Sequence, residues 1–314
     1  MALTRNRYWL RTTVVLFALL ALASLSPITV AAGESSRQLV VRHFVTLPSG
    51  LGAEGLVIRD GKLYVGAFSF TAPDGTVLVY GDDGELVGQF TIPGLPQVGQ
   101  LLFTGEDTLA VVAGNLGTGV GSVVSVNVET GSVRTIATGF KLPNGIAVDR
   151  RGNLFVSDLL AGTVSKVTPD GTVSLFASGP LLAPALIPHT TFILGSNDLT
   201  FNRERTALYV TNVGLNSVVK ISIRGDGQAG TVTKFASVPT PDGIAFGNKG
   251  QLFVTSPFTN SLFTISQSGS AQKLPLDQSQ EALNNPSNLA FDGRQLFITN
   301  LALGGTGTIA VVRV

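Results

Sequence analysis

Oxygen-bearing side chains recur at one position of a sequence repeat, and together they could hold a hard metal ion. The position lies just before a short apolar run, and its occupants are Glu54, Gly99, Asn144, Asn197, Asp242 and Ser287. Two carboxylates, two amide carbonyls and a hydroxyl carry a formal charge of about −2, which suits Ca²⁺ completed by water and, more loosely, Mg²⁺. Zinc is disfavoured, because the chain has no cysteine and only two histidines.

The spacing of these residues places them in equivalent positions of six repeat units. Successive intervals are 45, 45, 53, 45 and 45 residues, so one interval contains an insertion. A leucine-containing apolar triplet follows each of them, and the triplets begin at Leu63, Leu109, Leu154, Leu208, Leu252 and Leu296. In the third unit, turn residues separate four short apolar runs between 142 and 177, which predicts two consecutive hairpins. A repeat of this length and content is typical of one β-propeller blade.

These patterns predict an all-β protein whose fold is a six-bladed β-propeller of four-stranded antiparallel blades. The propeller is expected to span residues 39–314 as one domain, since six stacked repeats build one continuous core. The last unit, 286–314, ends after its third strand. We therefore expect the N-terminal strand 39–46 to supply the missing fourth strand and close the ring, which leaves only short, protected edges.

The first 32 residues have the pattern of a secretory signal peptide rather than of a folded element. Arg5, Arg7 and Arg11 precede an apolar run at 14–25, and the small residues at 30–32 suit a cleavage site. A short linker at 33–38 follows. The alternative is an uncleaved anchor, although the run is shorter than the ~20 residues that span a bilayer. We expect an exported protein, periplasmic or extracellular, that is not inserted in a membrane after cleavage.

The composition argues against nucleic acid as a partner and leaves a small molecule as the expected one. Charged residues make up 13% of the chain and the formal net charge is +1, so no broad field attracts a polyanion or an anionic bilayer. The absence of cysteine excludes disulfides, thiol nucleophiles and thiolate metal sites.

Turn chemistry is the competing explanation for part of the oxygen-donor set. Pro143-Asn144-Gly145 and Pro241-Asp242-Gly243 are ordinary turn sequences, in which the polar residue bonds nearby backbone. Glu54 and Asn197 have no such explanation, because glutamate is a poor turn residue and Asn197 precedes Asp198 rather than glycine. The metal interpretation depends mainly on these two residues.

The chain resembles the senescence marker protein/gluconolactonase family, whose members are six-bladed propellers with a central calcium ion. Paraoxonases and diisopropyl fluorophosphatases share that arrangement. The resemblance lies in the order and unit placement of Glu54, Asn144, Asn197 and Asp242, which match the Glu, Asn, Asn and Asp metal ligands of that family. It implies a calcium-dependent lactonase, with Asp242 also acting as general base. Family members that act on sugar lactones tend to carry an arginine two residues before the first asparagine ligand. Leu142 occupies that position, and this departure from the family pattern argues against a sugar-acid lactone and for a more hydrophobic lactone or related ester.

The loops expected on the metal face are apolar, and the inserted segment should cross that face. The rim sequences are 68–70, 159–160, 257–258 and 301–303, although these residues could also pack between blades. The segment 179–195 is the predicted lid. Its His189 is a candidate catalytic residue, as are Asp242 and Asp198. His43, on the closing strand, has no predicted role.

Two other functions remain open for the same fold. One is a non-catalytic NHL-repeat-like propeller whose metal face binds a peptide, glycan or other surface partner. The other is a lyase or strictosidine-synthase-like activity that uses a different acid on the same scaffold. A fold alone does not discriminate among these functions.

Overall fold

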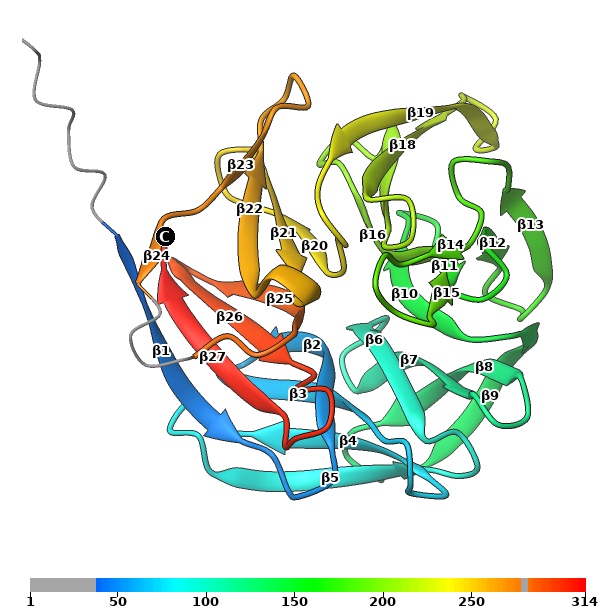
Figure 1. Ribbon diagram of the computed structural model, residues 1–314. Helices are drawn as coiled ribbons and strands as arrows, with labels where there is room; N and C mark the ends of the chain where they lie inside the picture. The colour runs from blue at the N-terminus through cyan, green and yellow to red at the C-terminus, as the bar shows by residue number, and fades with distance from the viewer. Residues whose placement is uncertain (1–37, 278–281) are drawn as a thin grey trace, which may run out of the picture. The chain divides into compact units, whose positions relative to one another are not determined.

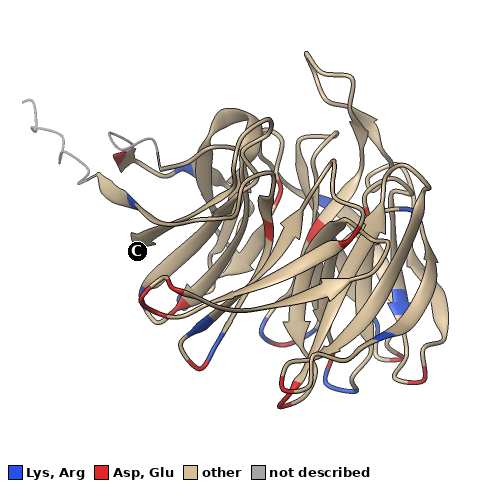
Figure 2. Cartoon of the chain, turned by 90° about the horizontal axis from the view of Figure 1, so that it is seen from below, with Lys and Arg blue, Asp and Glu red and all other residues tan. Residues whose placement is uncertain are grey.

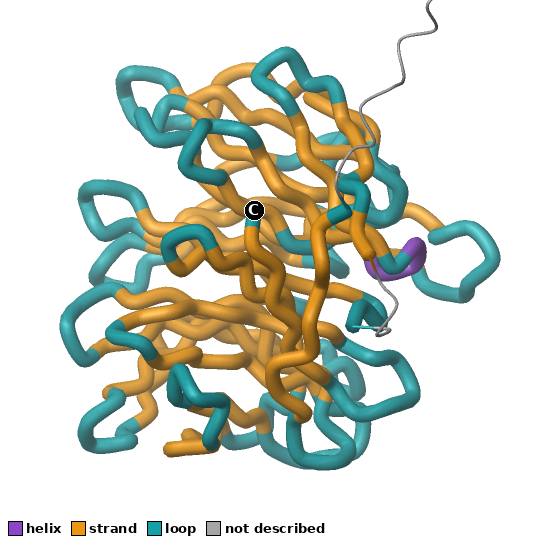
Figure 3. Tube along the Cα trace, turned by 90° about the vertical axis from the view of Figure 1, so that its left-hand side faces the viewer, coloured by secondary structure: helices purple, strands orange, loops and turns teal. Residues whose placement is uncertain are grey.

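Strands make up nearly all of the regular structure. The computed structural model describes residues 38–277 and 282–314, so the predicted signal segment 1–32 and all but Gln38 of the predicted linker lie outside the described residues. The sheets are arranged around a common axis (Figure 1). In the described residues the single helix is the short 3-10 helix η1 (Pro257–Thr259), purple in Figure 3. None of the described helical structure is long and apolar enough to cross a membrane. The prediction of an all-β, propeller-like fold is confirmed.

The first two repeats form one eight-stranded sheet. Their strands are β2 (Gly52–Arg59), β3 (Lys62–Phe68), β4 (Gly75–Tyr80), β5 (Leu86–Ile92), β6 (Gln97–Phe103), β7 (Thr108–Asn115), β8 (Val120–Asn127) and β9 (Val133–Phe140). Within each repeat the four strands pair in sequence order and antiparallel. The two groups are joined where Phe68, at the end of β3, pairs with Gln97, at the start of β6.

The next three repeats each form a separate four-stranded sheet in sequence order. The strands are β10 (Pro143–Val148), β11 (Leu154–Asp158), β12 (Thr163–Val167), β13 (Val173–Ala177), β16 (Ser196–Phe201), β17 (Ala207–Asn212), β18 (Ser217–Ile223), β19 (Ala229–Ser237), β20 (Ile244–Phe246), β21 (Leu252–Ser256), β22 (Ser261–Ile265) and β23 (Ala271–Lys273). The insertion between β13 and β16 contains a two-stranded hairpin, β14 (Ala185–Leu186) and β15 (Ile193–Leu194).

The final sheet joins the two ends of the described chain. Its strands are β25 (Pro286–Asp292), β26 (Gln295–Asn300), β27 (Thr308–Arg313), β1 (Leu39–Thr46) and β24 (Leu276–Asp277). Strand β1 pairs antiparallel with β27, and β24 adds to the outer side of β1 as a parallel strand. The sheets therefore do not separate into six sheets of four strands, because one residue pair merges β2–β9 and β24 adds a fifth strand here. The count of six blades stays a prediction.

The apolar core lies between adjacent sheets, and the repeated triplets supply much of it. Phe155 of β11 is 2% exposed and packs edge-on against Phe176 and Phe201, with ring centroids 4.7 and 5.1 Å apart. Phe201 belongs to the next four-stranded sheet along the chain, so this aromatic contact holds two sheets together. Edge-on aromatic pairs stabilise beyond the area that they bury.

Hydroxyl side chains from the second strand of four repeats tie each repeat to the next. Their hydrogen bonds to backbone carbonyl oxygens run from Ser157 to Asn197, from Thr211 to Asp242, from Thr255 to Ser287 and from Thr299 to Glu54. The Thr299 bond, 2.7 Å long, joins residues 245 positions apart in the sequence. In the first repeat the equivalent residue is Gly66, where a Cβ would lie 2.4 Å from the Gly99 carbonyl oxygen. Glycine therefore lets the next repeat approach directly.

Replacing Thr299 with the isosteric valine is expected to lower the free energy of unfolding by about 1–3 kcal/mol. The change removes the hydroxyl that donates to the Glu54 carbonyl and accepts the Asn288 N–H, and it leaves both buried groups without this partner. Thr299→Ser keeps the hydroxyl and serves as the matched control. Urea denaturation of both variants measures the difference, and a Thr299→Val protein as stable as Thr299→Ser would contradict this role.

Candidate metal centre and substrate pocket

Register shifts interrupt the first strand of most repeats at the oxygen-donor position. They fall between Ala53 and Leu56, Val98 and Leu101, Pro143 and Ile146, Ser196 and Leu199, and Pro286 and Leu289. In the remaining repeat, Asp242 and Gly243 directly precede β20. A bulge bends its strand and redirects the side chains of the extra residues. The repeated position is thereby taken out of the regular ladder.

The four predicted metal ligands come together as two amide–carboxylate pairs. The side-chain amide of Asn144 donates to Glu54 Oε1 at 3.0 Å, and that of Asn197 donates to Asp242 Oδ1 at 2.7 Å. All four residues are buried and line one pocket. Glu54 Oε2 and Asn197 Oδ1 have no hydrogen-bond partner, and they are two of only five such buried side-chain atoms in the described residues. The structure thus leaves oxygen atoms free at the place where a ligand is predicted.

Burial and mutual repulsion make this cluster costly to keep negatively charged. Burial raises the pKa of Glu54 to about 7; the Asn144 hydrogen bond acts against this shift, and the charge of Asp198 adds to it. The pKa of Asp242 is raised well above its ordinary value by burial, then by the charge of Glu54 and that of Asp198. Two buried carboxyl groups that repel each other are stabilised by a cation placed between them.

The donor chemistry of the cluster fits a divalent cation held through oxygen. Within residues 38–277 and 282–314, neither Glu54 nor Asp242 forms an ion pair with a basic side chain. The same residues contain no group of three or more His, Cys, Asp or Glu side chains that could hold a metal, so the amides of Asn144 and Asn197 would have to complete the set. Carboxylates combined with amide carbonyls are ligands that Ca²⁺ accepts in flexible geometry.

A second polar layer occupies the position one residue after the oxygen donors. Gln100, Asp198 and Asn288 occupy it in alternate repeats, and the other three repeats have Gly55, Gly145 and Gly243 there. The Gln100 amide donates to Asn288 Oδ1 at 2.9 Å, and the Asn288 amide donates to Asp198 Oδ2 at 3.2 Å. A Cβ on Gly55 would lie 2.2 Å from the Gly99 carbonyl oxygen, so the glycines make room for neighbouring backbone. None of the six residues lines the pocket.

The pocket that the four predicted metal ligands line has a volume of about 240 Å³ and mostly apolar walls. Besides the four ligands, its lining residues are Phe68, Phe70, Leu116, Leu142, Leu159, Leu160, Thr191, Phe192, Ile193, Leu194, Val213, Pro257, Phe258, Leu301 and Leu303. Thr191 is the one polar side chain of this wall in the described residues. The predicted apolar rim sequences all contribute to it. Such a pocket favours an apolar ligand whose polar group meets the four oxygen-bearing residues at its base.

The inserted segment contributes residues 191–194 to this pocket, as the predicted lid position requires. The candidate catalytic histidine does not join them, because His189 is exposed and absent from the lining. His43 lies on β1 and contacts the Thr46 hydroxyl at 3.2 Å. A catalytic role for His189 stays a prediction that no contact in the structure supports.

The two aspartate candidates occupy different environments. Asp242 lines the pocket, with one carboxylate oxygen hydrogen-bonded to Asn197. Asp198 lies outside the lining, and its carboxylate accepts the backbone N–H groups of Leu199 and Ile244 and the Asn288 amide. Burial raises the pKa of Asp198 to about 7, although these three hydrogen bonds act against the shift. Of the two, only Asp242 faces the space where a substrate would lie.

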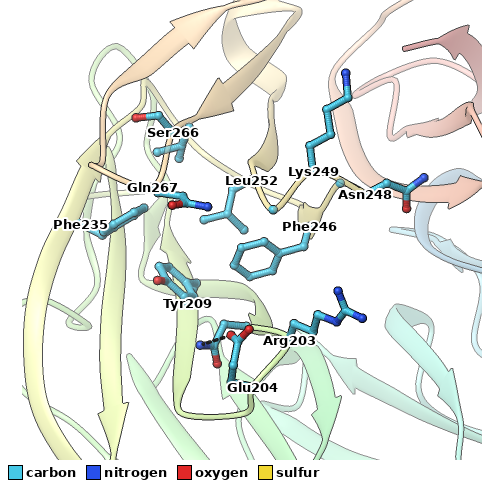
Figure 4. A pocket seen from close by; sticks show the side chains of 14 residues that line it. Arg203, Glu204, Tyr209, Phe235, Phe246, Asn248, Lys249, Leu252, Ser266 and Gln267 are labelled. Carbon is cyan, nitrogen blue, oxygen red and sulfur yellow. Dashed lines mark hydrogen bonds between the residues drawn. The ribbon is translucent and has the colours of Figure 1, made fainter.

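A larger pocket of about 530 Å³ lies elsewhere, among the β16–β17, β20–β21 and β22–β23 turns. Figure 4 shows Tyr209, Phe235 and Phe246 grouped in it, while Arg203 and Lys249 extend away from the rings. Tyr209 packs edge-on against both phenylalanines, at 4.9 and 5.5 Å. None of the predicted ligands or catalytic residues lines this pocket, so it is not the candidate centre.

The described structure is similar to several solved enzymes. A putative gluconolactonase superposes with a TM-score of 0.66 at 17% identity, covering 88% of this chain and 93% of its own. A gluconolactonase from Xanthomonas campestris gives 0.65 at 17% identity, covering 87% and 89%. A luciferin-regenerating enzyme gives 0.64 at 16% identity, covering 88% and 95%. No protein-family model and no curated protein matches the sequence.

A solved structure with a lower TM-score is an enzyme of a different class, a lyase. A catalytically inactive histidine-to-alanine variant of virginiamycin B lyase from Staphylococcus aureus has a TM-score of 0.58 at 14% identity, covering 88% of this chain and 100% of its own. At these identities the likeness shows a shared fold. The gluconolactonase-like propeller expected from the sequence is therefore confirmed as the fold.

Proposed function

We propose that this protein is a calcium-dependent hydrolase of a small hydrophobic lactone or related ester. The main support is the meeting of Glu54, Asn144, Asn197 and Asp242 in the lining of one apolar pocket, with two oxygen atoms that have no partner. The gluconolactonase and luciferin-regenerating enzyme neighbours support an enzymatic, lactonase-type function. Another divalent cation that prefers oxygen ligands would bind to the same four residues.

Each ligand residue has a distinct task in the proposed reaction. When bound, the ion would act as a Lewis acid that polarises the substrate carbonyl. Glu54 and Asp242 supply the negative charge that holds it, and the amides of Asn144 and Asn197 fix the two carboxylates through their hydrogen bonds. Asp242 lines the pocket and is the proposed base that takes a proton from the attacking water.

The walls of the pocket define the proposed substrate class. A volume of about 240 Å³ fits a small ligand, and the wall offers little hydrogen bonding beyond Thr191. Leu142 lines the pocket at the position where the resembling family tends to have arginine. A sugar-acid lactone would leave its hydroxyl groups without partners on this wall, whereas an apolar ring or chain would not.

A lyase is the less favoured catalytic alternative. The lyase neighbour is inactive as a histidine-to-alanine variant, and no histidine among the described residues lines the pocket of this protein. A non-catalytic, NHL-repeat-like binding propeller remains the alternative from another class. It would leave the partner-free oxygen atoms of Glu54 and Asn197 without a purpose.

Hydrolysis of a panel of lactones and esters, graded in apolar chain length, tests the function. We expect calcium-dependent turnover that rises with apolar character, and at least ~100-fold lower kcat/KM in Asp242→Asn, the range for loss of a general base. Asp74→Asn is the matched control, because Asp74 is exposed, does not line the pocket and bonds the Gly94 N–H. Absence of hydrolysis across the panel, or equal activity of the two variants, would contradict the proposal.

We also propose six blades, export and ring closure as the setting of this site. The eight-stranded sheet counts as two blades joined at one residue pair, and β1 is the fourth strand of the last blade. The Thr299 bond to Glu54 supports closure between the last and first repeats. Export rests on the sequence pattern of residues 1–32, which predicts a cleaved signal.

A further inference from the structure

Exposed apolar side chains gather around the mouth of the pocket. Fourteen large apolar residues are exposed in the described chain, and six of them line this one pocket. These six are Phe70, Leu116, Phe192, Ile193, Phe258 and Leu303. Phe70 is 62% exposed and Ile193 58%, so much of their surface faces outward. Three further exposed residues lie near them: Val120 begins β8 directly after the loop of Leu116, Leu186 pairs with Ile193, and Leu215 lies in the β17–β18 connection with the pocket residue Val213.

These residues sit on separate loops rather than in one groove. They come from the β3–β4, β7–β8, β21–β22 and β26–β27 connections and from the inserted hairpin, where Leu186 pairs with Ile193. Each loop presents one or two apolar side chains around a shared opening. A rigid protein partner seated on all of them would block the pocket, whereas a fluid apolar phase would leave it accessible.

The charged residues lie mostly in the other set of connections. Exposed charge is sparse in the pocket-side loops, where it occurs only at Asp74 and Lys141 among residues 69–74, 93–96, 116–119, 141–142, 159–162, 178–192, 213–216, 238–243, 257–260 and 301–307. The described part of the connection between β23 and β25, also on this side, adds the half-buried Asp277. By contrast, acidic or basic residues occur in every turn joining the first strand of a repeat to the second, from Arg59–Lys62 to Asp292–Arg294. In Figure 2 most coloured segments lie in the hairpins at the lower end, and the upper loops are mostly tan.

We propose that the pocket face docks onto a neutral lipid surface, with the rim residues inserted among the lipids. The rim consists of Phe70, Leu116, Phe192, Ile193, Phe258 and Leu303. The rim loops carry almost no basic residue, so an anionic headgroup is not what they recognise. Apolar side chains on a face with little charge lose water-exposed surface when they enter the boundary of a bilayer. Docking in this orientation opens the pocket directly to apolar molecules dissolved in the lipid. The docking proposal does not depend on the proposed hydrolysis.

Co-sedimentation with phosphatidylcholine vesicles tests the docking. Residues 33–314 are the protein to use, because they include the compact unit Arg37–Val314 and omit the apolar run at 14–25, which would bind lipid by itself. We expect the parent to partition into the vesicle pellet and Phe70→Ser/Phe192→Ser/Ile193→Ser to partition at least tenfold more weakly. Val173→Ser/Leu175→Ser, on β13, is the matched control, since these residues are 40% and 63% exposed away from the pocket. It should stay within twofold of the parent.

Further measurements keep the result unambiguous. Phe258→Ser/Leu303→Ser removes other rim residues and replaces the triple variant if that variant fails to fold. Phosphatidylglycerol in the vesicles should leave binding within twofold, because Lys141 is the one exposed basic residue in the pocket-side loops that the structure describes. Failure of the parent to bind, equal weakening in the β13 control, or a requirement for anionic lipid would overturn the proposal. So would dimerisation in sedimentation velocity that the rim variants abolish, because the face would then be an interface between copies of the chain.

Discussion

Removal of divalent ions with a chelator is expected to lower the melting temperature, and Glu54→Gln or Asp242→Asn is expected to abolish that response. An ion bound only by the folded state stabilises it by RT ln(1 + [L]/Kd), ~2.7 kcal/mol at a hundredfold excess over Kd. For a folded unit of this size the corresponding rise in melting temperature is roughly 5 °C. Differential scanning calorimetry with calcium and with chelator measures both quantities.

The charge of the cluster predicts how the variants behave without the ion. Glu54 and Asp242 are buried, repel each other and have no basic partner in the described residues. Replacing either carboxylate with its amide removes that repulsion, so the metal-free variants should melt no lower than the metal-free parent. Their loss of response would therefore report loss of the ion rather than damage to the fold.

Ser287→Ala is the control for the calcium experiment. Ser287 occupies the same repeat position but is absent from the pocket lining, and its hydroxyl donates to the Ala53 carbonyl oxygen at 2.7 Å. This variant should lose about 1 kcal/mol of stability and keep the full calcium response. A parent protein whose melting ignores both calcium and chelator would contradict the metal centre and favour the binding propeller.

The repeat period made most of the fold predictable from the sequence. Constant spacing between Glu54, Asn144 and Asp242, interrupted once, fixed the strand order and located the insertion that forms β14 and β15. How the strands divide into sheets was not predictable, because it depends on local hydrogen bonds. One pair, Phe68 with Gln97, merges two repeats, and β24 adds to β1 through a short parallel contact.

The sequence predicted which four residues come together in the candidate site, and it predicted less of the structure that supports them. The four oxygen donors were visible because they recur at one repeat position. The bridging hydroxyls of Ser157, Thr211, Thr255 and Thr299 also recur, three residues after the leucine of each triplet, and that spacing could have identified them. The layer formed by Gln100 and Asn288 carries no such signal, since it alternates with glycine. The position of His189 depends on loop conformation, which the pattern does not determine.

Loss of strand β1 is expected to unfold the protein at 37 °C. The strand and the residues just after it bury Val41, Val45 and Leu47, which are 0%, 6% and 3% exposed. Burial of one such side chain stabilises by roughly 1.5–3 kcal/mol, so their joint loss is comparable with the whole stability of a domain, about 5–15 kcal/mol. Removing β1 also exposes the backbone edge of β27. Far-UV circular dichroism and thermal melting of residues 48–314, compared with 33–314, measure the loss.

Substitutions at two neighbouring valines of β1 distinguish the loss of packing in the sheet from a general effect of changing the strand's sequence. Val41 is fully buried in a cluster with Leu296, Ala310 and Val312, whereas Val40 is 46% exposed. Side chains alternate between the two faces of a strand, so the pair shares backbone geometry and differs in burial. Val41→Ala should reduce stability by about 2 kcal/mol, and Val40→Ala should change it by less than about 0.5 kcal/mol. Equal effects of the two substitutions in urea denaturation would place β1 outside the sheet in solution.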